Sequence, residues 1–334
     1  MKALILAGGL GTRLRPLTYT RPKHLLPIAN RPHIEHVLDL LLAHDVRDVV
    51  LLTSYLAEEF EPTVVSARAR GINVEVTHEQ EPLGTAGALK NAEELVGDDT
   101  FLAFNGDILT DVNLGEVVRF HRANSAMTTI LLTPVADPSA FGVVPTEADG
   151  RVTGFIEKPP AGTAPTNLIN AGVYVFEPAA LERIPSGEVW SAERALFPEL
   201  VAEGAPVYAM GTEAYWLDIG TPDKFLQGNL DALAGRYVTS AVPSPGGSVS
   251  VIDDSAIVDA SARISSSCIG AGVEVGAGAV VDRSVILPGV HVGARASVHD
   301  SSIGEGALIA SGALVSGAAI GDGARIEPWE GSTK

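Results

Sequence analysis

The residues best suited to chemistry lie at the start of the chain, where a short apolar stretch runs into a glycine-rich, strongly basic loop. Residues 3–6 are apolar, and Gly8, Gly9 and Gly11 follow them. The first 34 residues hold six basic residues and no acidic one, although the whole chain has a formal charge of −18. Backbone N–H groups of a glycine loop can approach phosphate oxygens closely, because no Cβ blocks them. The loop therefore predicts a pocket for a polyanion such as a nucleoside triphosphate.

Two common glycine-loop motifs do not fit this segment. A Walker A loop would place Gly-Lys-Ser/Thr after four intervening residues, and the dinucleotide fingerprint would place a third glycine where Leu14 stands. A tight turn after a strand is the alternative interpretation of the glycines when they are taken alone.

The elements that must position this loop alternate between strands and helices. Short apolar runs predict strands at 4–6, 48–53, 100–104 and 128–132. Amphipathic stretches predict helices at 33–44, with Pro32 as the first helical residue, and at 85–95 and 114–121. Such alternation predicts an α/β fold with a Rossmann-like, mostly parallel, doubly wound sheet. Ligands of these sheets bind at the carboxyl ends of the strands, where the glycine loop falls.

The chain beyond residue 250 repeats with a period of 17 residues. Isoleucines recur at 252, 269, 286, 303 and 320, and other aliphatic residues follow each of the first four at spacings of six. This hexapeptide pattern predicts a parallel β-helix with three short faces per coil and aliphatic side chains pointing inward. We predict an α/β domain at 1–235, a linker of small and polar residues at 236–250, and the β-helix at 251–327.

Composition and charge exclude several classes of protein. The one cysteine, Cys268, excludes an intrachain disulfide framework and favours a reducing cytoplasm. No apolar run approaches the roughly 20 residues that span a bilayer. The acidic net charge disfavours nucleic acid and anionic membranes as partners. We expect a cytoplasmic protein that binds neither nucleic acid nor membrane.

The order of residues in the opening loop resembles the signature of the sugar-1-phosphate nucleotidyltransferases. Gly-Gly-x-Gly-Thr-Arg-Leu-x-Pro-Leu-Thr is followed by Pro-Lys and Leu-Pro, over about 25 contiguous residues. Later runs, among them Pro-Leu-Gly-Thr-Ala-Gly and Tyr-Trp-Leu-Asp-Ile-Gly-Thr-Pro, are similar to the mannose-1-phosphate guanylyltransferases within that family. The resemblance implies a nucleotidyltransferase catalytic domain, a left-handed β-helix after it, and transfer of a nucleotide to a sugar 1-phosphate with release of pyrophosphate.

The resemblance also implies roles for residues of the opening segment. Arg13 would hold the β- and γ-phosphates, and Lys23 would neutralise the α-phosphate and the sugar phosphate. A solvated surface cation is the alternative for each. The nucleotide-binding residues carried over from the family signature are Leu6, Ala7, Gly8, Gly9, Gly11, Thr12 and Arg13.

Two aspartates match the metal-binding aspartates of the family. Asp107 stands in Phe-Asn-Gly-Asp, and Asp218 stands in Trp-Leu-Asp-Ile-Gly. Two anions must meet in this reaction, and a divalent cation screens their repulsion. Carboxylate oxygens suit Mg²⁺, so we expect Mg²⁺ as cofactor. Capping of a turn is the alternative role for either aspartate.

Further runs resemble the sites for the sugar and the base. For the sugar phosphate these are Phe-Gly-Val-Val, Glu-Lys-Pro and Asn-Ala-Gly, which give Gly142, Glu157, Lys158 and Asn170. A solvated strand end is the alternative for Glu157 and Lys158. The base would be bound around Gln80, Gly84 and Thr85, and Thr85 would also serve as the N-cap of the helix that follows.

The expected substrates are GTP and mannose 1-phosphate, which would give GDP-mannose. A glucose-1-phosphate thymidylyltransferase of the longer type, forming dTDP-glucose, is an alternative. GTP-dependent activation of another sugar or cyclitol phosphate is a further one. The phosphate-binding residues do not distinguish these reactions, because phosphate chemistry is common to all of them.

Two other classes of protein fit the sequence less well. Hexapeptide β-helices also occur in acyltransferases, where His291 or His299 would act as base, but this β-helix is short and no extension builds an acyl-CoA site. A non-catalytic regulatory subunit would be expected to lose Arg13, Lys23 or a metal aspartate, and all are present. The open ends and flat faces of a β-helix need covering, so we expect a homo-oligomer assembled through it.

Overall fold

The computed structural model describes residues 1–79 and 81–328. The chain forms two compact units. The first holds Met1–Gly9 and Val37–Trp216, and the second holds Leu10–His36 and the chain from Leu217 onward. The basic opening segment therefore groups with the C-terminal part of the chain. The domain boundaries drawn from the sequence at 235 and 250 stay predictions.

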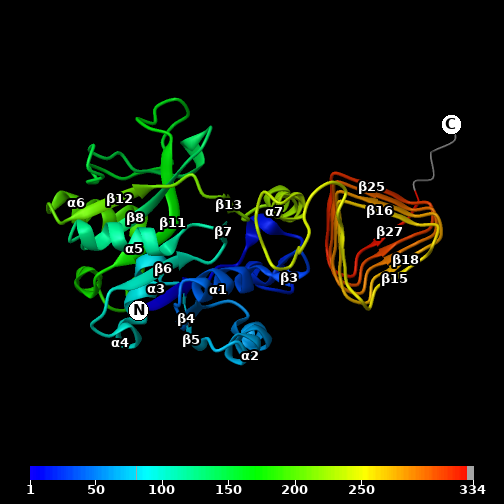
Figure 1. The fold of residues 1–334 in the computed structure, drawn as a ribbon, viewed down its shortest axis with the longest axis horizontal. Coiled ribbons are helices and arrows are strands. Elements are labelled where there is room, and N and C mark those ends of the chain that lie inside the picture. The colour runs from blue at the N-terminus through cyan, green and yellow to red at the C-terminus, as the bar shows by residue number, and fades with distance from the viewer. Residues whose placement is uncertain (80, 329–334) are drawn as a thin grey trace. The chain divides into compact units, whose positions relative to one another are not determined.

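The first unit is built on a nine-stranded sheet whose main path runs β10-β9-β11-β6-β1-β4-β5, with β8 between β11 and β12 (Figure 1). The pairs β1–β4, β1–β6, β4–β5 and β8–β12 are parallel, whereas β11 runs antiparallel to its neighbours. This confirms the Rossmann-like, mostly parallel sheet. The strands are β1 (Lys2–Leu6), β4 (Asp48–Thr53), β5 (Asn73–His78), β6 (Phe101–Asn105), β8 (Thr128–Pro134), β9 (Gly142–Val143), β10 (Ile156–Glu157), β11 (Leu168–Phe176) and β12 (Val207–Gly211).

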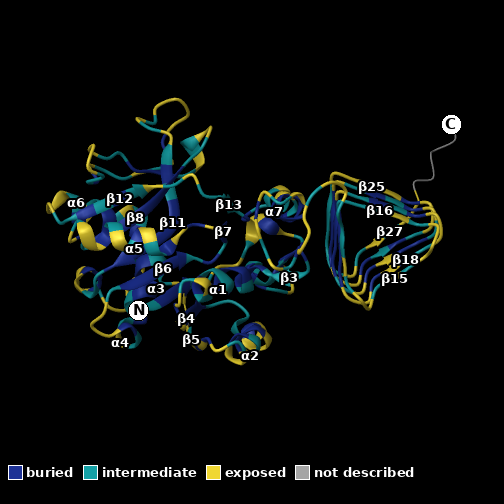
Figure 2. Ribbon diagram, in the orientation of Figure 1, coloured by how far each residue is buried: buried dark blue, intermediate teal, exposed yellow. Residues whose placement is uncertain are grey.

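Helices and short connecting elements surround this sheet, and its inner strands are mostly buried, whereas β5 at one edge is mostly exposed (Figure 2). No helix among residues 1–79 and 81–328 is long and apolar enough to cross a membrane. The helices are α1 (His33–Ala43), α2 (Glu61–Ala69), α3 (Gly84–Asn91), α4 (Glu93–Val96), α5 (Leu114–Ala123), α6 (Phe197–Ala202) and α7 (Pro222–Ala234). The short strands β2 (Pro27–Ile28), β3 (Arg31–Pro32), β7 (Ile108–Thr110) and β13 (Trp216–Asp218) complete the units.

Two helix predictions need correction. The stretch 85–95 forms two helices that meet at Ala92, whose N–H bonds to the carbonyls of Leu89 and Lys90 in a tightened last turn. Pro32 does not begin α1, because it pairs with Pro27 in the β2–β3 hairpin directly before the helix.

The β-helix has the predicted register. Ile252 pairs with Ile269, and the same alignment continues through Ile286, Ile303 and Ile320. The strands form three parallel sheets, and inward-pointing aliphatic side chains fill the space between them. The sheets are β14 (Val251–Ile252), β17 (Cys268–Ile269), β20 (Val285–Ile286), β23 (Ser302–Ile303) and β26 (Ala319–Ile320); β15 (Ile257–Val258), β18 (Glu274–Val275), β21 (His291–Val292), β24 (Leu308–Ile309) and β27 (Arg325–Ile326); and β16 (Arg263–Ser265), β19 (Val280–Asp282), β22 (Ser297–His299) and β25 (Leu314–Ser316).

Candidate active site

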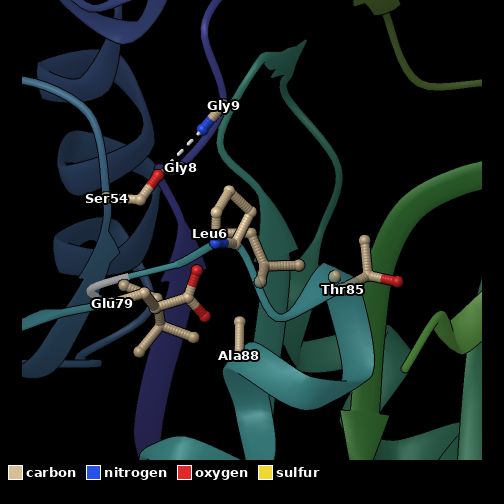
Figure 3. A pocket seen from close by; sticks show the side chains of 10 residues that line it. Leu6, Gly8, Gly9, Ser54, Glu79, Thr85 and Ala88 are labelled. Atoms are coloured by element: carbon tan, nitrogen blue, oxygen red, sulfur yellow. Dashed lines mark hydrogen bonds between the residues drawn. The ribbon is translucent and has the colours of Figure 1, made fainter. Parts of the chain in front are cut away.

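A pocket of about 210 Å³ opens in the first unit at the carboxyl end of β1 (Figure 3). Its walls come from the ends of β1 and β4, the chain after β5 and the first turns of α3, which is where parallel sheets bind ligands. The pocket brings together five of the predicted nucleotide-binding residues. The lining residues are Leu6, Gly8, Gly9, Leu52, Ser54, Glu79, Pro82, Gly84, Thr85 and Ala88.

Close neighbours restrict two glycines of the pocket, a side-chain hydroxyl at Gly8 and a backbone carbonyl at Gly84. A Cβ at position 8 would lie 2.9 Å from Ser54 Oγ, and one at position 84 would lie 2.8 Å from the carbonyl oxygen of Trp190. Gly84 also has a φ of +75°, which side chains rarely tolerate. Ser54 Oγ accepts a hydrogen bond of 3.3 Å from the Gly9 N–H, so it fixes the loop after β1 (Figure 3).

The prediction for Thr85 is wrong in one respect. The helix α3 begins at Gly84, with Leu83 at the cap position, so Thr85 does not cap it. Its hydroxyl instead donates to Glu193 Oε2 at 2.7 Å and accepts from the Ala192 N–H at 2.7 Å. The helix therefore starts two residues earlier than a cap at Thr85 would place it. Gln80, the other residue predicted at the base, lies outside the described residues.

Glu79 is a pocket residue that the sequence did not single out. It follows β5 directly and is only 8% exposed, and its carboxylate is directed into the pocket (Figure 3). Burial raises the pKa of Glu79, while a hydrogen bond from the Leu83 N–H partly offsets this. Among the described residues, its Oε1 has no hydrogen-bond partner. A buried acceptor of this kind is costly, and a ligand with N–H donors would satisfy it.

The second unit folds the basic segment back on itself. Gly11 has a φ of +57°, and a Cβ there would lie 3.2 Å from Thr18 Cγ2 and 3.3 Å from Lys23 Cβ. The Thr18 hydroxyl donates to the Gly11 carbonyl oxygen at 2.8 Å. Thr12 and Arg13 lie in the short 3₁₀ helix Thr12–Leu14, and Lys23 begins a second one, Lys23–Leu25.

Arg13 and Asp218 both lie beside Gly220 in this unit. Asp218 Oδ1 accepts the Gly220 N–H at 2.8 Å, and a Cβ on Gly220 would be 3.5 Å from Arg13 Nη2. Lys224 Nζ lies 3.8 Å from Asp218 Oδ2, a cation that sequence reasoning did not predict. Asp218 therefore closes a turn, and the side chains of Lys224 and Arg13 lie near that turn.

Asp107 follows β6 in the first unit, in a turn fixed by the Gly106 N–H, which donates to the Leu6 carbonyl at 3.0 Å. Nearby Tyr174 is fully buried. Burial raises its pKa well above the ordinary value, and the charges of Glu193 and Asp107 raise it further. The Tyr174 hydroxyl accepts a hydrogen bond of 2.8 Å from the Asn170 side-chain amide.

Three of the four residues predicted for the sugar phosphate lie on neighbouring strands of the first unit, and Lys158 directly follows β10. Gly142 pairs with Glu157 across β9–β10, and a Cβ at position 142 would lie 2.6 Å from the ring of Phe155. Lys158 Nζ is 3.7 Å from Glu157 Oε1. Asn170 lies on β11, which pairs with β9. Their roles in binding stay predictions.

Asp107 lies in the first unit and Asp218 in the second. Within residues 1–79 and 81–328, no group of three His, Cys, Asp or Glu side chains could hold a metal ion. The carboxylate oxygens of the two aspartates are of the kind that Mg²⁺ prefers, and proteins commonly bind that ion through one or two carboxylates together with substrate phosphates and water.

The chain belongs to the nucleotidyl transferase family, which it matches over residues 2–235. Residues 247–330 match the GMPPB C-terminal domain. The protein is therefore a nucleotidyltransferase, and the resemblance found in the opening segment is confirmed.

Named relatives agree with this class. The chain is 41% identical to a mannose-1-phosphate guanylyltransferase of Mycobacterium tuberculosis, over 82% of this chain and 76% of that protein. It is 38% identical to the mannose-1-phosphate guanylyltransferase catalytic subunit beta of Xenopus tropicalis, over 80% and 74%. Among solved structures it is similar to HddC from Yersinia pseudotuberculosis complexed with GMP-PN, with a TM-score of 0.60, 28% identity, and 68% and 97% of the two chains covered.

Proposed function

We propose that this protein joins GTP and mannose 1-phosphate to form GDP-mannose and pyrophosphate. The names of its relatives and the guanine nucleotide in a related structure support this pair of substrates. The observation that carries the choice of base is the buried carboxylate of Glu79 in the pocket beside the glycine loop.

Glu79 suits guanine better than thymine. Guanine presents two adjacent donors on its Watson–Crick edge, N1–H and the exocyclic amine. An ionised carboxylate is an acceptor only, so it can satisfy both donors. Thymine presents one N–H between two carbonyl oxygens, and those oxygens would repel the carboxylate. A buried acceptor therefore favours GTP over dTTP.

The reaction is a direct displacement. An oxygen of the sugar phosphate attacks the α-phosphorus, the bond to the oxygen that bridges to the β-phosphate breaks, and pyrophosphate leaves with that electron pair. In our proposal Arg13 holds the β- and γ-phosphates. Lys23 neutralises the α-phosphate and the sugar phosphate as they approach.

Asp107 and Asp218 would hold Mg²⁺ in this proposal. Bound Mg²⁺ supplies positive charge that offsets the phosphate oxygens during transfer. Gly142, Glu157, Lys158 and Asn170 would bind the sugar phosphate. Glu157 would accept hydrogen bonds from hydroxyl groups, and Lys158 would pair with the phosphate.

The test is a matrix of nucleoside triphosphates against sugar 1-phosphates, with pyrophosphate release as the readout. We expect the highest kcat/KM with GTP and mannose 1-phosphate, and loss of turnover when Mg²⁺ is chelated. Turnover with dTTP and glucose 1-phosphate but not with GTP would overturn the guanylyl assignment. Turnover with GTP and a different sugar phosphate would support the assignment of the base and overturn the assignment of the sugar.

We further propose a cytoplasmic homo-oligomer assembled through the hexapeptide β-helix. Exposed apolar side chains on the β-helix, Ile257 and Leu314, support a contact there, since each is 67% exposed. Sedimentation of the full chain should show a species larger than a monomer, and a monomer alone at all concentrations would contradict the proposal.

A further inference from the structure

An ion-pair cluster joins the basic opening segment to the far end of the β-helix, within the second unit. Arg21 Nη2 lies 2.5 Å from Glu305 Oε2 and 3.3 Å from Asp322 Oδ2. The hydroxyl of Thr20 also donates to Asp322. The two acids follow strands β23 and β26, in the last described coils.

Most of this cluster is shielded from solvent. The side chains of Arg21 and Asp322 are 17% and 15% exposed, while that of Glu305 is 52% exposed. Asp322 is itself held in place, because its Oδ1 accepts the Glu305 backbone N–H at 2.7 Å. Partly buried pairs with fixed geometry are screened less by salt than surface pairs.

The coil fold does not require the two acids. Glu305 and Asp322 occupy equivalent positions in successive coils, 17 residues apart. The same position holds Asp254 in the first coil and the neutral residues Ala271 and Pro288 in the next two. A coil therefore forms without an acid at this position, and the acids of the last two coils are the ones that contact Arg21.

The same segment contacts the β-helix at two further points. Asn30 Nδ2 donates to the carbonyl oxygens of Ile269 at 2.6 Å and Val251 at 3.4 Å, in the first two coils. Pro16 packs on Gly321, where a Cβ would lie 3.1 Å from the proline Cβ. The segment is therefore attached near both ends of one β-helix sheet.

We propose that Glu305 and Asp322 form an acidic anchor that positions the catalytic segment through Arg21. Arg21 lies two residues before Lys23 and eight after Arg13. Holding Arg21 on the β-helix fixes the backbone that carries both cations. This makes Arg21 a positioning residue and gives the β-helix a part in catalysis; the inference rests on the proposed roles of Arg13 and Lys23.

The experiment compares the full-length double variant Glu305→Gln/Asp322→Asn with the wild type in pyrophosphate release, using GTP, mannose 1-phosphate and Mg²⁺. We expect kcat per folded molecule to fall about tenfold, because displaced cations stabilise the transition state less. Arg21→Gln should cause a similar loss. Adding Arg21→Gln to the double variant should cost little more, since the acids act through Arg21.

The matched control is Asp300→Asn, which removes the half-exposed β-helix ion pair between Arg283 and Asp300, 2.7 Å apart. We expect its kcat to stay near that of the wild type. An unchanged kcat in the double variant, or an equal loss in Asp300→Asn, would overturn the anchor, whatever happens to the melting temperature. Failure of the proposed phosphate roles would be distinguishable, because Lys23→Ala would then retain turnover.

Discussion

The pocket in the first unit and the basic segment in the second unit differ in what surrounds them. The pocket is mostly apolar and backbone-lined, with the one buried carboxylate of Glu79. The segment presents cations, Arg13 and Lys23, and Arg13 lies with Asp218 beside Gly220. We infer that the first region selects the base, whereas the second handles charge that every nucleoside triphosphate carries. Selectivity and phosphate chemistry would then be separable by mutation.

Replacement of Lys23 should have the largest effect. Lys23→Ala removes the cation proposed to offset charge at the α-phosphate, so kcat should fall about 10²- to 10³-fold with any nucleoside triphosphate. Pyrophosphate release with GTP and with the best alternative nucleotide measures this. Arg119→Ala, which removes a solvent-exposed partner of Glu116, is the control and should be near wild type. A loss confined to GTP would contradict the separation of the two regions.

Replacement of Glu79 should have a smaller and more selective effect. Glu79→Gln puts an amide donor opposite the guanine amine, so kcat/KM for GTP should fall about 10- to 100-fold, an effect of roughly 1–3 kcal/mol. The kcat/KM for dTTP should stay constant or rise. Glu81→Gln makes the same chemical change at an exposed neighbouring position and serves as the control. Equal losses for both nucleotides would remove Glu79 from base selection.

The sequence predicted more about the basic segment and the β-helix than about the pocket. The opening segment and the β-helix could be interpreted directly, because the signature residues are contiguous and the 17-residue period fixes the register from Ile252 to Ile320. The role of Glu79 could not be predicted from the sequence, because its burial and its unsatisfied oxygen arise only when β5 and α3 come together. A signal was present, since Glu79 directly precedes the run that resembles the base site.

Contacts between residues far apart in the sequence could not be predicted from the sequence either. Arg21 and Glu305 are 284 residues apart. They pair only because the folded chain brings one particular coil of the β-helix next to the basic opening segment. The cap expected at Thr85 was wrong because α3 already begins at Gly84, and the Thr85 hydroxyl bonds to Glu193 and Ala192, more than 100 residues away. Sequence pattern thus identified the chemistry on each element, and tertiary packing determined which groups meet.

Lowering the pH should weaken GTP binding through Glu79. Burial raises the pKa of Glu79 above the value of about 4.3 for an exposed glutamate. As the pH falls through this raised pKa, the carboxyl takes up a proton and ceases to be an acceptor for both guanine donors. The KM for GTP should therefore rise on acidification from neutral pH, and Glu79→Gln should not show that rise. An identical pH profile in the variant would assign the titration to another group.

The smallest effect is expected from thiol reagents on the wild type, and it reports on the second region. Cys268 is fully buried in β17, and burial raises the pKa of its thiol to about 12, so almost no reactive thiolate forms at neutral pH. A maleimide should leave the activity unchanged and label the protein only on unfolding. The backbone of Ala29, on the segment that Arg21 anchors, is near enough to Cys268 to offset part of the rise in its pKa. Faster labelling of Glu305→Gln/Asp322→Asn than of Asp300→Asn would show that the anchor closes the segment over the β-helix. Equal labelling rates would mean that the anchor positions only the part of the segment around Arg21.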